Sequence, residues 1–218
     1  LFSPHAIIRS VEEGLKLNFA DAISNERKLF EECIESPQRQ GLIHSFFAER
    51  ANTKIPELKE GTPIELKKIG IIGGGTMGTG ISMAAMNAGF DVIMVEQNDE
   101  AIQKAEAKIN STYDRSVKLN RITTEQKNKT MEMFSATIDF SDLKDRDLII
   151  EAVFENMDVK KEVFTKLNEI CSQNCILASN TSYLNVNEIA SVVDNPSRVI
   201  GLHFFSPANI MKLLEVVV

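Results

Sequence analysis

The stretch Lys68-Ile69-Gly70-Ile71-Ile72-Gly73-Gly74-Gly75-Thr76-Met77-Gly78 decides the fold of this chain. An apolar run of strand length leads into a Gly-x-Gly-x-x-Gly pattern formed by Gly73, Gly75 and Gly78. In such a turn the first glycine permits the tight bend, and the second lets a pyrophosphate approach the main chain. The third lets the following helix pack closely against the strand. This order of strand, glycines and helix predicts a dinucleotide-binding unit.

The residues after the turn extend this signature. Thr76 and Met77 open the predicted helix, whose N–H groups and positive potential favour phosphate. A second apolar run, residues 91–95, ends at Glu96, which follows Gly78 by 18 residues. An acid near this spacing hydrogen-bonds the adenosine ribose, and its charge repels a 2′-phosphate. We therefore expect the cofactor to be NAD and not NADP.

Composition and charge limit the class of protein. A chain of 218 residues, 43% hydrophobic and 25% charged, is typical of one globular α/β domain with an appendage. The net charge of -7 argues against a nucleic-acid partner or an anionic membrane surface. An odd number of cysteines indicates a reducing compartment. Cys171 and Cys175 lack the C-x-x-C spacing of zinc and redox sites, so we expect no metal site.

The chain is expected to have three parts. Residues 1–50 are predicted to be helical, with helices beginning at Ser3-Pro4, Asp21 and Ser36-Pro37. Residues 51–66 are rich in turn formers and are interpreted as a linker. Residues 67–218 alternate strands with helices, which predicts a Rossmann-type doubly wound, mostly parallel sheet. The chain begins without Met and stops within an apolar run, so we expect it to be a piece of a larger protein.

Seven strands are predicted, with a charged helical hairpin at 99–131 inserted between the second and third. The strands are 68–72, 91–96, 134–138, 147–153, 175–179, 198–203 and 212–218. Ligands of such sheets lie beyond the carboxyl ends of the strands, so the residues that follow each strand are the candidates for chemistry.

His203 and Glu215 are the candidate catalytic pair. A histidine at a strand end is often structural, but this one lies where the nicotinamide is expected, and a carboxylate occupies the neighbouring segment. A dehydrogenase needs a base for the hydroxyl proton, and histidine titrates nearest neutrality. Glu155 and Lys160, after strand four, are either ordinary helix N-terminal charges or ligand contacts. The Ser179–Ser182 run is either a helix cap or a hydrogen-bonding loop over the cofactor.

The second part of the chain resembles the L-3-hydroxyacyl-CoA dehydrogenases. The matching motifs are Gly73-Gly74-Gly75-Thr76-Met77-Gly78, Glu151-Ala152-Val153-Phe154-Glu155, Ala178-Ser179-Asn180-Thr181-Ser182, Gly201-Leu202-His203-Phe204-Phe205-Ser206-Pro207 and Met211-Lys212-Leu213-Leu214-Glu215-Val216. The resemblance implies that His203 is the catalytic base and Glu215 its partner. It also implies that Ser182 contacts substrate and nicotinamide.

The same resemblance suggests further ligand contacts. Ala152 and Val153 would line the cofactor site, and Glu155 and Lys160 would contact cofactor or acyl-CoA. Ser206 would lie at the substrate, although many members of the family carry Asn there. Ser206, and Glu96 in place of Asp, make the chain more similar to the peroxisomal bifunctional hydratase–dehydrogenase branch.

These features together predict NAD-dependent oxidation of L-3-hydroxyacyl-CoA to 3-ketoacyl-CoA in fatty-acid β-oxidation. The expected partners are an upstream hydratase domain, whose end residues 1–50 resemble, and a C-terminal helical domain of the same parent chain. The expected location is the peroxisome, with the mitochondrion as the alternative. The 218 residues alone are expected to have little activity. Two alternatives remain open, a 3-hydroxyacid (6-phosphogluconate-like) dehydrogenase and a non-catalytic NAD-binding interaction module.

Overall fold

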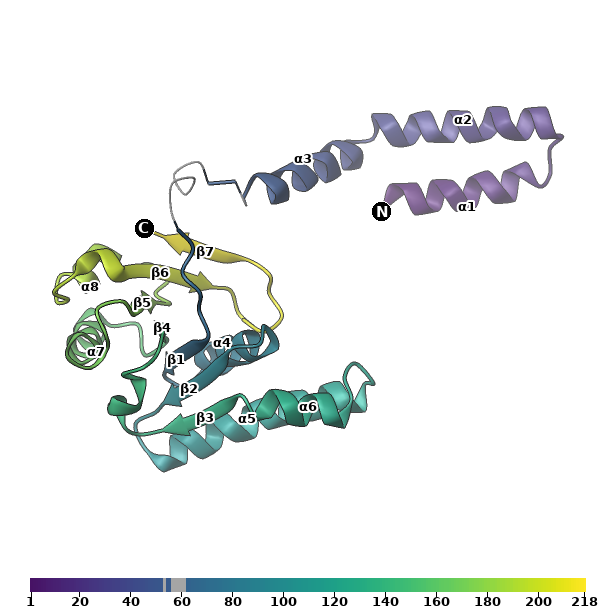
Figure 1. The fold of residues 1–218 in the computed structure, drawn as a ribbon. Coiled ribbons are helices and arrows are strands. Elements are labelled where there is room, and N and C mark those ends of the chain that lie inside the picture. The colour runs from purple at the N-terminus through teal and green to yellow at the C-terminus, as the bar shows by residue number, and fades with distance from the viewer. Residues whose placement is uncertain (53, 56–61) are drawn as a thin grey trace. The chain divides into compact units, whose positions relative to one another are not determined.

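The computed structural model describes residues 1–52, 54–55 and 62–218. The chain divides into two compact units, Leu1–Pro63 and Ile64–Val218, which are described separately (Figure 1). Residues 53 and 56–61, within the expected linker 51–66, lie outside the described residues. No helix in the described ranges is long and apolar enough to cross a membrane.

The first unit is helical, as predicted. Its helices are α1 (Phe2–Gly14), α2 (Phe19–Glu35) and α3 (Pro37–Ala51). Helix α1 packs along α2 (Figure 1). The predicted start of α3 is confirmed, since the Ser36 side chain accepts the N–H of Arg39 and Pro37 occupies the first turn.

Two predicted helix starts in this unit are wrong by one or two residues. Helix α2 begins at Phe19 and not at Asp21, because the Asn18 side chain accepts the N–H of Asp21 and so caps the helix earlier. Helix α1 begins at Phe2, one residue before Ser3-Pro4. Ser, Asn and Asp are all good capping residues, so their presence alone does not say which one ends the extended segment.

The second unit is the predicted Rossmann-type doubly wound domain. Among the described residues, seven strands form one sheet in the order β3-β2-β1-β4-β5-β6-β7. All neighbouring pairs are parallel except β6 and β7, which are antiparallel. The strands are β1 (Lys68–Ile72), β2 (Asp91–Val95), β3 (Phe134–Thr137), β4 (Leu148–Glu151), β5 (Ile176–Ser179), β6 (Val199–Phe204) and β7 (Leu214–Val217). All seven predicted strands are present; β1 has the predicted ends, and the other six differ slightly at one or both ends. Strand β4, for example, stops at Glu151 and not at residue 153.

Helices cover both faces of this sheet (Figure 1). They are α4 (Thr76–Asn87), α5 (Asp99–Lys118), α6 (Thr124–Met131), α7 (Met157–Ile170) and α8 (Val186–Ala190), with short 3-10 helices at Phe140–Leu143 and Pro196–Arg198. Helices α5 and α6 form the predicted insertion 99–131. Each begins at a side-chain cap, Asn98 for α5 and Thr123 for α6.

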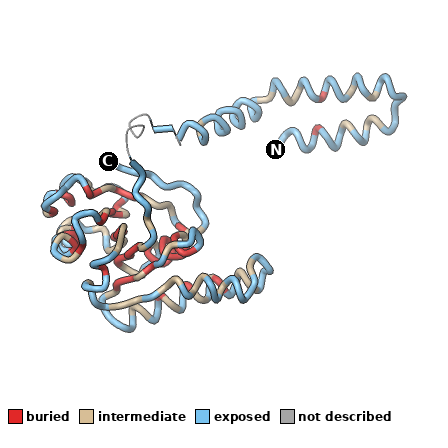
Figure 2. Tube along the Cα trace, in the orientation of Figure 1, coloured by how far each residue is buried: buried red, intermediate tan, exposed pale blue. Residues whose placement is uncertain are grey.

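The strands alternate their side chains between two apolar clusters. Ile71 of β1 packs with Ile81 of α4 and Ile109 of α5, whereas the next residue, Ile72, packs with Phe164 of α7. This alternation places one core on each face of the sheet, and buried residues gather along the strands and α4 (Figure 2). The two cores fix the strands, so the loops at their carboxyl ends project from a rigid edge.

Candidate cofactor and active site

The glycine turn joins β1 to α4 at the carboxyl edge of the sheet. Gly73 has φ +96°, a conformation that residues with a side chain rarely adopt. A Cβ built on Gly78 would lie 1.7 Å from the carbonyl oxygen of Gly73, so the third glycine is needed for packing. A Cβ built on Gly75 would meet nothing within 4 Å. There is therefore no room for a side chain at Gly78, whereas the space beside Gly75 is open to a ligand.

Helix α4 leaves its N-terminus open for an anion. Gly75 is its N-cap, no side chain caps it, and its first turn contains no acidic residue. Helices α5, α6 and α7 differ, since each has a side-chain cap and an acid in its first turn. The N–H groups at Thr76 and Met77 and the helix dipole thus favour a phosphate group at this point. These features fit the pyrophosphate of a dinucleotide.

A cleft of about 620 Å³ opens beside this turn. It is lined by Ile72, Gly73, Gly75, Thr76, Met77, Val95, Glu96, Gln97, Phe140, Ala152, Val153, Phe154, Val159, Glu162, Val163 and Lys166. The structure therefore brings seven of the predicted cofactor residues together: Gly73, Gly75, Thr76, Met77, Glu96, Ala152 and Val153. Gly78, Glu155 and Lys160 are not among the lining residues.

The lining residues that the sequence reasoning missed include Phe140, Glu162 and Lys166. The Lys166 ammonium lies 5.7 Å from the centroid of the Phe140 ring and 2.7 Å from the Glu162 carboxylate. The spacing of Glu162 and Lys166 on α7 predicts their ion pair, but only the packing of the 3-10 helix against α7 brings Phe140 beside them.

Glu96 connects the end of β2 to the glycine turn. One carboxylate oxygen accepts the N–H of Gly74, and the other accepts the N–H of Gln97 at 2.9 Å. These two hydrogen bonds hold the carboxylate at the side of the cleft next to β2. A ribose hydroxyl bound in the cleft could donate to it there.

His203 and Glu215 face each other across β6 and β7. The antiparallel register pairs these two residues directly, and His203 Nδ1 lies 2.8 Å from Glu215 Oε2. The imidazole is 22% exposed and the carboxylate 53% exposed, so the pair is reachable from solvent. The ring of Phe205 packs against the imidazole with centroids 4.7 Å apart. The arrangement orients the imidazole and selects one tautomer, as a carboxylate does in hydrolase triads.

Glu155 lies just after β4 and holds the loop that follows β5. Its Oε1 accepts the Thr181 hydroxyl at 2.6 Å and the Ser182 N–H at 2.8 Å, and its Oε2 lies 3.1 Å from Lys160 Nζ. Burial acts to raise the pKa of Glu155, but these three donors outweigh it and hold the pKa below its ordinary value. Glu155 is therefore ionised near neutral pH.

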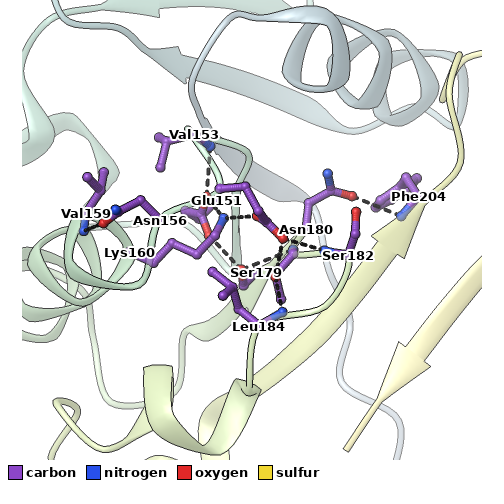
Figure 3. Close-up of polar contacts among 12 residues, drawn as sticks. Glu151, Val153, Asn156, Val159, Lys160, Ser179, Asn180, Ser182, Leu184 and Phe204 are labelled. Atoms are coloured by element: carbon purple, nitrogen blue, oxygen red, sulfur yellow. Dashed lines mark hydrogen bonds and ion pairs between the residues drawn. The ribbon is translucent and has the colours of Figure 1, made fainter.

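Lys160 is buried within the domain, and its expected contact with the cofactor or acyl-CoA stays a prediction. Its side chain is only 1% exposed, and its ammonium lies 2.7 Å from Glu151 and 3.1 Å from Glu155 (Figure 3). Glu151, at the last position of β4, is 0% exposed and has no part in the sequence-based site. An acid that ends an otherwise apolar strand was the signal for such a partner, because a buried carboxylate requires a counter-ion.

The two predicted substrate residues lie in loops at the same edge. Ser182 follows β5 and is exposed, with its backbone tied to Glu155. Ser206 follows β6 and is also exposed. Between these loops, Asn180 Oδ1 accepts the N–H of Phe204, the neighbour of His203, at 2.9 Å. The loops after β4, β5 and β6 are thus connected to one another.

Residues 68–218 match the family described as 3-hydroxyacyl-CoA dehydrogenase, NAD binding domain. The chain belongs to this family. This match favours the 3-hydroxyacyl-CoA dehydrogenase prediction over the 3-hydroxyacid dehydrogenase alternative. The described residues contain no group of three or more His, Cys, Asp and Glu that could hold a metal ion.

Known relatives agree with this assignment. The chain is 37% identical to a peroxisomal fatty acid beta-oxidation multifunctional protein of Oryza sativa subsp. japonica, over 97% of this chain and 30% of the rice protein. The structure of the dehydrogenase part of multifunctional enzyme 1 from C. elegans matches with a TM-score of 0.64 and 37% identity, covering 70% of this chain and 35% of that one. The 3-hydroxybutyryl-CoA dehydrogenase of Escherichia coli K12 gives a TM-score of 0.69 and 37% identity, covering 70% and 32%. The chain thus spans about a third or less of each of these proteins.

Proposed function

We propose that the protein containing this chain oxidises L-3-hydroxyacyl-CoA to 3-ketoacyl-CoA with NAD, as one activity of a multifunctional enzyme of fatty-acid β-oxidation. The observation that carries the proposal is the 2.8 Å contact of His203 Nδ1 with Glu215 Oε2 at the edge of the sheet that holds the dinucleotide turn. A base with an oriented tautomer beside a dinucleotide cleft fits the oxidation of a secondary alcohol.

Each member of the pair has a distinct role in this reaction. Because Nδ1 faces Glu215, the proton of the 3-hydroxyl group would be taken by Nε2 of His203. Glu215 would stabilise the resulting imidazolium and keep the ring in place. Bound NAD supplies the hydride acceptor at its nicotinamide ring.

The remaining residues would bind and orient the ligands. In the direction set by the fold, Glu96 would hydrogen-bond the adenosine ribose, and Thr76 and Met77 would hold the pyrophosphate. Ala152 and Val153 would line the path towards the nicotinamide. The loops carrying Ser182 and Ser206 would meet the acyl-CoA. This assignment is supported by their placement along one edge of the sheet.

We further propose the parent context. The rice relative is named a peroxisomal multifunctional protein and is covered over only 30% of its length, which supports a longer parent chain and favours the peroxisome over the mitochondrion. The upstream hydratase domain and the C-terminal helical domain are proposed from the resemblance of the sequence. In this context the acyl-CoA is bound between the present domain and parts of the parent chain beyond it.

The test is NADH-dependent reduction of acetoacetyl-CoA by the full-length protein and its His203→Gln variant. A positioned base contributes about 10²–10⁴-fold in rate, so the variant should lose at least about 10² in kcat. Its affinity for NADH should stay nearly unchanged, because His203 is not among the residues lining the cofactor cleft. A His203→Gln enzyme with near wild-type kcat would remove His203 from the role of base. A wild-type protein that binds NADH without reducing the substrate would identify a non-catalytic NAD-binding module.

A further inference from the structure

The connection between β6 and β7, residues 205–213, has one buried residue. Among the described residues from 203 to 218, Ala208 alone is buried, with 5% of its surface exposed. It lies between His203 and Glu215 in the sequence, in the segment that joins the two members of the proposed catalytic pair. Apart from the pairing of the two strands, Ala208 is therefore where this segment packs into the domain.

Ala208 packs against Gly80 of α4, and Figure 1 shows the β6–β7 connection reaching this helix. A Cβ built on Gly80 would lie 3.2 Å from both the Cβ and the backbone nitrogen of Ala208. Ordinary contacts of a Cβ are 3.4–4 Å, so a side chain at this position would press on the backbone of the connection. The glycine thus leaves the space that Ala208 occupies.

Helix α4 is the fixed side of this contact. It begins at the cofactor turn, and Gly78 lies so close to the Gly73 carbonyl oxygen that no Cβ fits between them. The helix therefore cannot shift without opening the turn that faces the pyrophosphate. A side chain added at Gly80, which is itself buried, must be accommodated by the β6–β7 connection.

The β6–β7 connection would move as a unit. The N–H groups of Ile210 and Met211 both donate to the Pro207 carbonyl oxygen at 2.9 Å, so Ala208 lies in a closed turn. Displacement of Ala208 therefore displaces the whole turn. Ser206, which the proposed reaction places at the acyl-CoA, directly precedes this turn.

We propose that Gly80 is a positioning residue for the catalytic pair. Its missing side chain lets Ala208 rest on α4, and this contact sets the conformation of the connection that brings Glu215 opposite His203. Helix α4 thus faces the cofactor with its first turn and holds the β6–β7 connection with its second. The inference rests on the proposed function, because it assigns the contact to the geometry of the proposed base and its carboxylate partner.

A role in the stability of α4 does not explain this glycine. Glycine inside a helix is less favourable than alanine, because it loses more backbone freedom on folding. The helix alone would therefore favour alanine at Gly80. The position gains something from glycine only through its neighbour, and that neighbour is Ala208.

The experiment compares Gly80→Ala, Ala208→Gly and the double variant in the full-length protein. Gly41→Ala is the matched control, because it adds the same methyl group inside a helix, where that methyl meets no atom within 4 Å. The measured quantities are kcat and KM for acetoacetyl-CoA reduction, NADH affinity by titration, and the unfolding temperature.

Positioning predicts a loss of turnover without a loss of cofactor binding. A misplacement of about 1 Å can lower a rate by about 10²-fold, so a shift of a few tenths of an ångström should lower kcat of Gly80→Ala by about three- to tenfold. Its NADH affinity should stay within about twofold, and its unfolding temperature should not fall, because alanine favours the helix. In the Ala208→Gly background the same substitution should cost less, since one of the two contacting atoms is gone. Gly41→Ala should match the wild type.

A second double-mutant cycle tests whether the effect passes through the catalytic pair. If Gly80→Ala acts by misplacing Glu215, it should lower kcat by less than about twofold in the Glu215→Gln background. Equal losses in the presence and absence of Glu215 would overturn the inference. If Gly80→Ala does not fold, Ala208→Val adds bulk to the same contact from the other side and should show the same selective loss.

The remaining outcomes separate the two proposals. A Gly80→Ala enzyme with wild-type kcat would overturn the positioning inference, and so would a lowered unfolding temperature with NADH affinity and kcat reduced alike. If the wild-type protein does not reduce acetoacetyl-CoA, the proposed function fails. If it does and Gly80→Ala matches Gly41→Ala, only the positioning inference fails.

Discussion

Alanine at two glycines of the same turn should separate folding from cofactor binding. At Gly78 the new methyl carbon would lie 1.7 Å from the Gly73 carbonyl oxygen and 2.9 Å from its carbonyl carbon. Carbon–oxygen contacts normally stay beyond about 3.3 Å, so the backbone of the turn or helix α4 must move by more than about 1 Å. Neither moves easily, because Gly73 already has φ +96° and Gly78 is buried.

The size of the Gly78 effect follows from this clash. Overpacking costs about 1–3 kcal/mol, and the upper end applies here because the obstacle is backbone. At about 2–4 °C per kcal/mol for a domain of this size, Gly78→Ala should lower the unfolding temperature by about 6–12 °C.

At Gly75 the balance is reversed. The methyl group meets no atom within 4 Å, and φ is −67°, so Gly75→Ala should change stability by no more than about 0.5 kcal/mol. The methyl would, however, occupy the side of the turn that a pyrophosphate approaches. NADH binding should therefore weaken by at least about tenfold, or about 1.4 kcal/mol.

Thermal unfolding and NADH titration of both variants of the full-length protein test this reasoning. Gly75→Ala should have the wild-type unfolding temperature and a weakened affinity for NADH. Gly78→Ala should have a lowered unfolding temperature. A Gly75→Ala protein with wild-type NADH affinity would show that the cofactor does not approach this turn. A Gly78→Ala protein with wild-type stability would show that the close packing of α4 on the turn is wrong.

Three further predictions concern single carboxylates. Glu215→Gln should lower kcat by at least about 10² with NADH affinity nearly unchanged, and equal loss of both in stopped-flow and titration experiments would contradict its role beside His203. Because Glu96 would face a 2′-phosphate, NAD should bind at least about tenfold more tightly than NADP, and equal affinities by calorimetry would refute this. Glu155 has a pKa lowered from 4.5 by the fold, so its ionised form stabilises the native state above about pH 4.5 and this stabilisation is lost as pH falls through the lowered value. In urea unfolding Glu155→Gln should thus be less stable than wild type at pH 7, and the difference should shrink as the pH falls below about 4.5; a difference that does not shrink would rule out the ionised role.

The fold was readable from the sequence because its signals are local. The strand from Lys68 to Ile72, the turn that follows and the alternation of later strands with helices each obey a short-range rule, and the sheet order then follows from the fold class. The sequence also predicted that His203 and Glu215 lie on neighbouring segments of the sheet. Their direct pairing needed the register of β6 and β7, which depends on the loop between them.

The position of Lys160 could not be obtained in this way. Its sequence position after β4 is that of a ligand contact, but the direction of its side chain depends on Glu151, which points inward because of the pleat of a strand buried on both faces. The beginning of α2 at Phe19, after the Asn18 cap, in place of Asp21 shows the same limit at small scale. In both cases residues of suitable chemistry were recognised, and three-dimensional packing selected between them.

The contact between His203 and Glu215 depends on how firmly strand β7 stays paired with β6. The four residues of β7 are exposed, and among the described residues this strand lies at the end of the sheet with β6 as its one neighbouring strand. Separation of an edge strand costs less free energy than unfolding of the whole domain, so β7 amides should exchange with solvent faster than those of β1 or β4. A slip by one residue would turn Glu215 to the opposite face and leave His203 without its carboxylate. A contact that stabilises the pairing of β7 with β6 would therefore raise the fraction of molecules in which His203 and Glu215 are paired. It would do so without contacting the cofactor or the substrate.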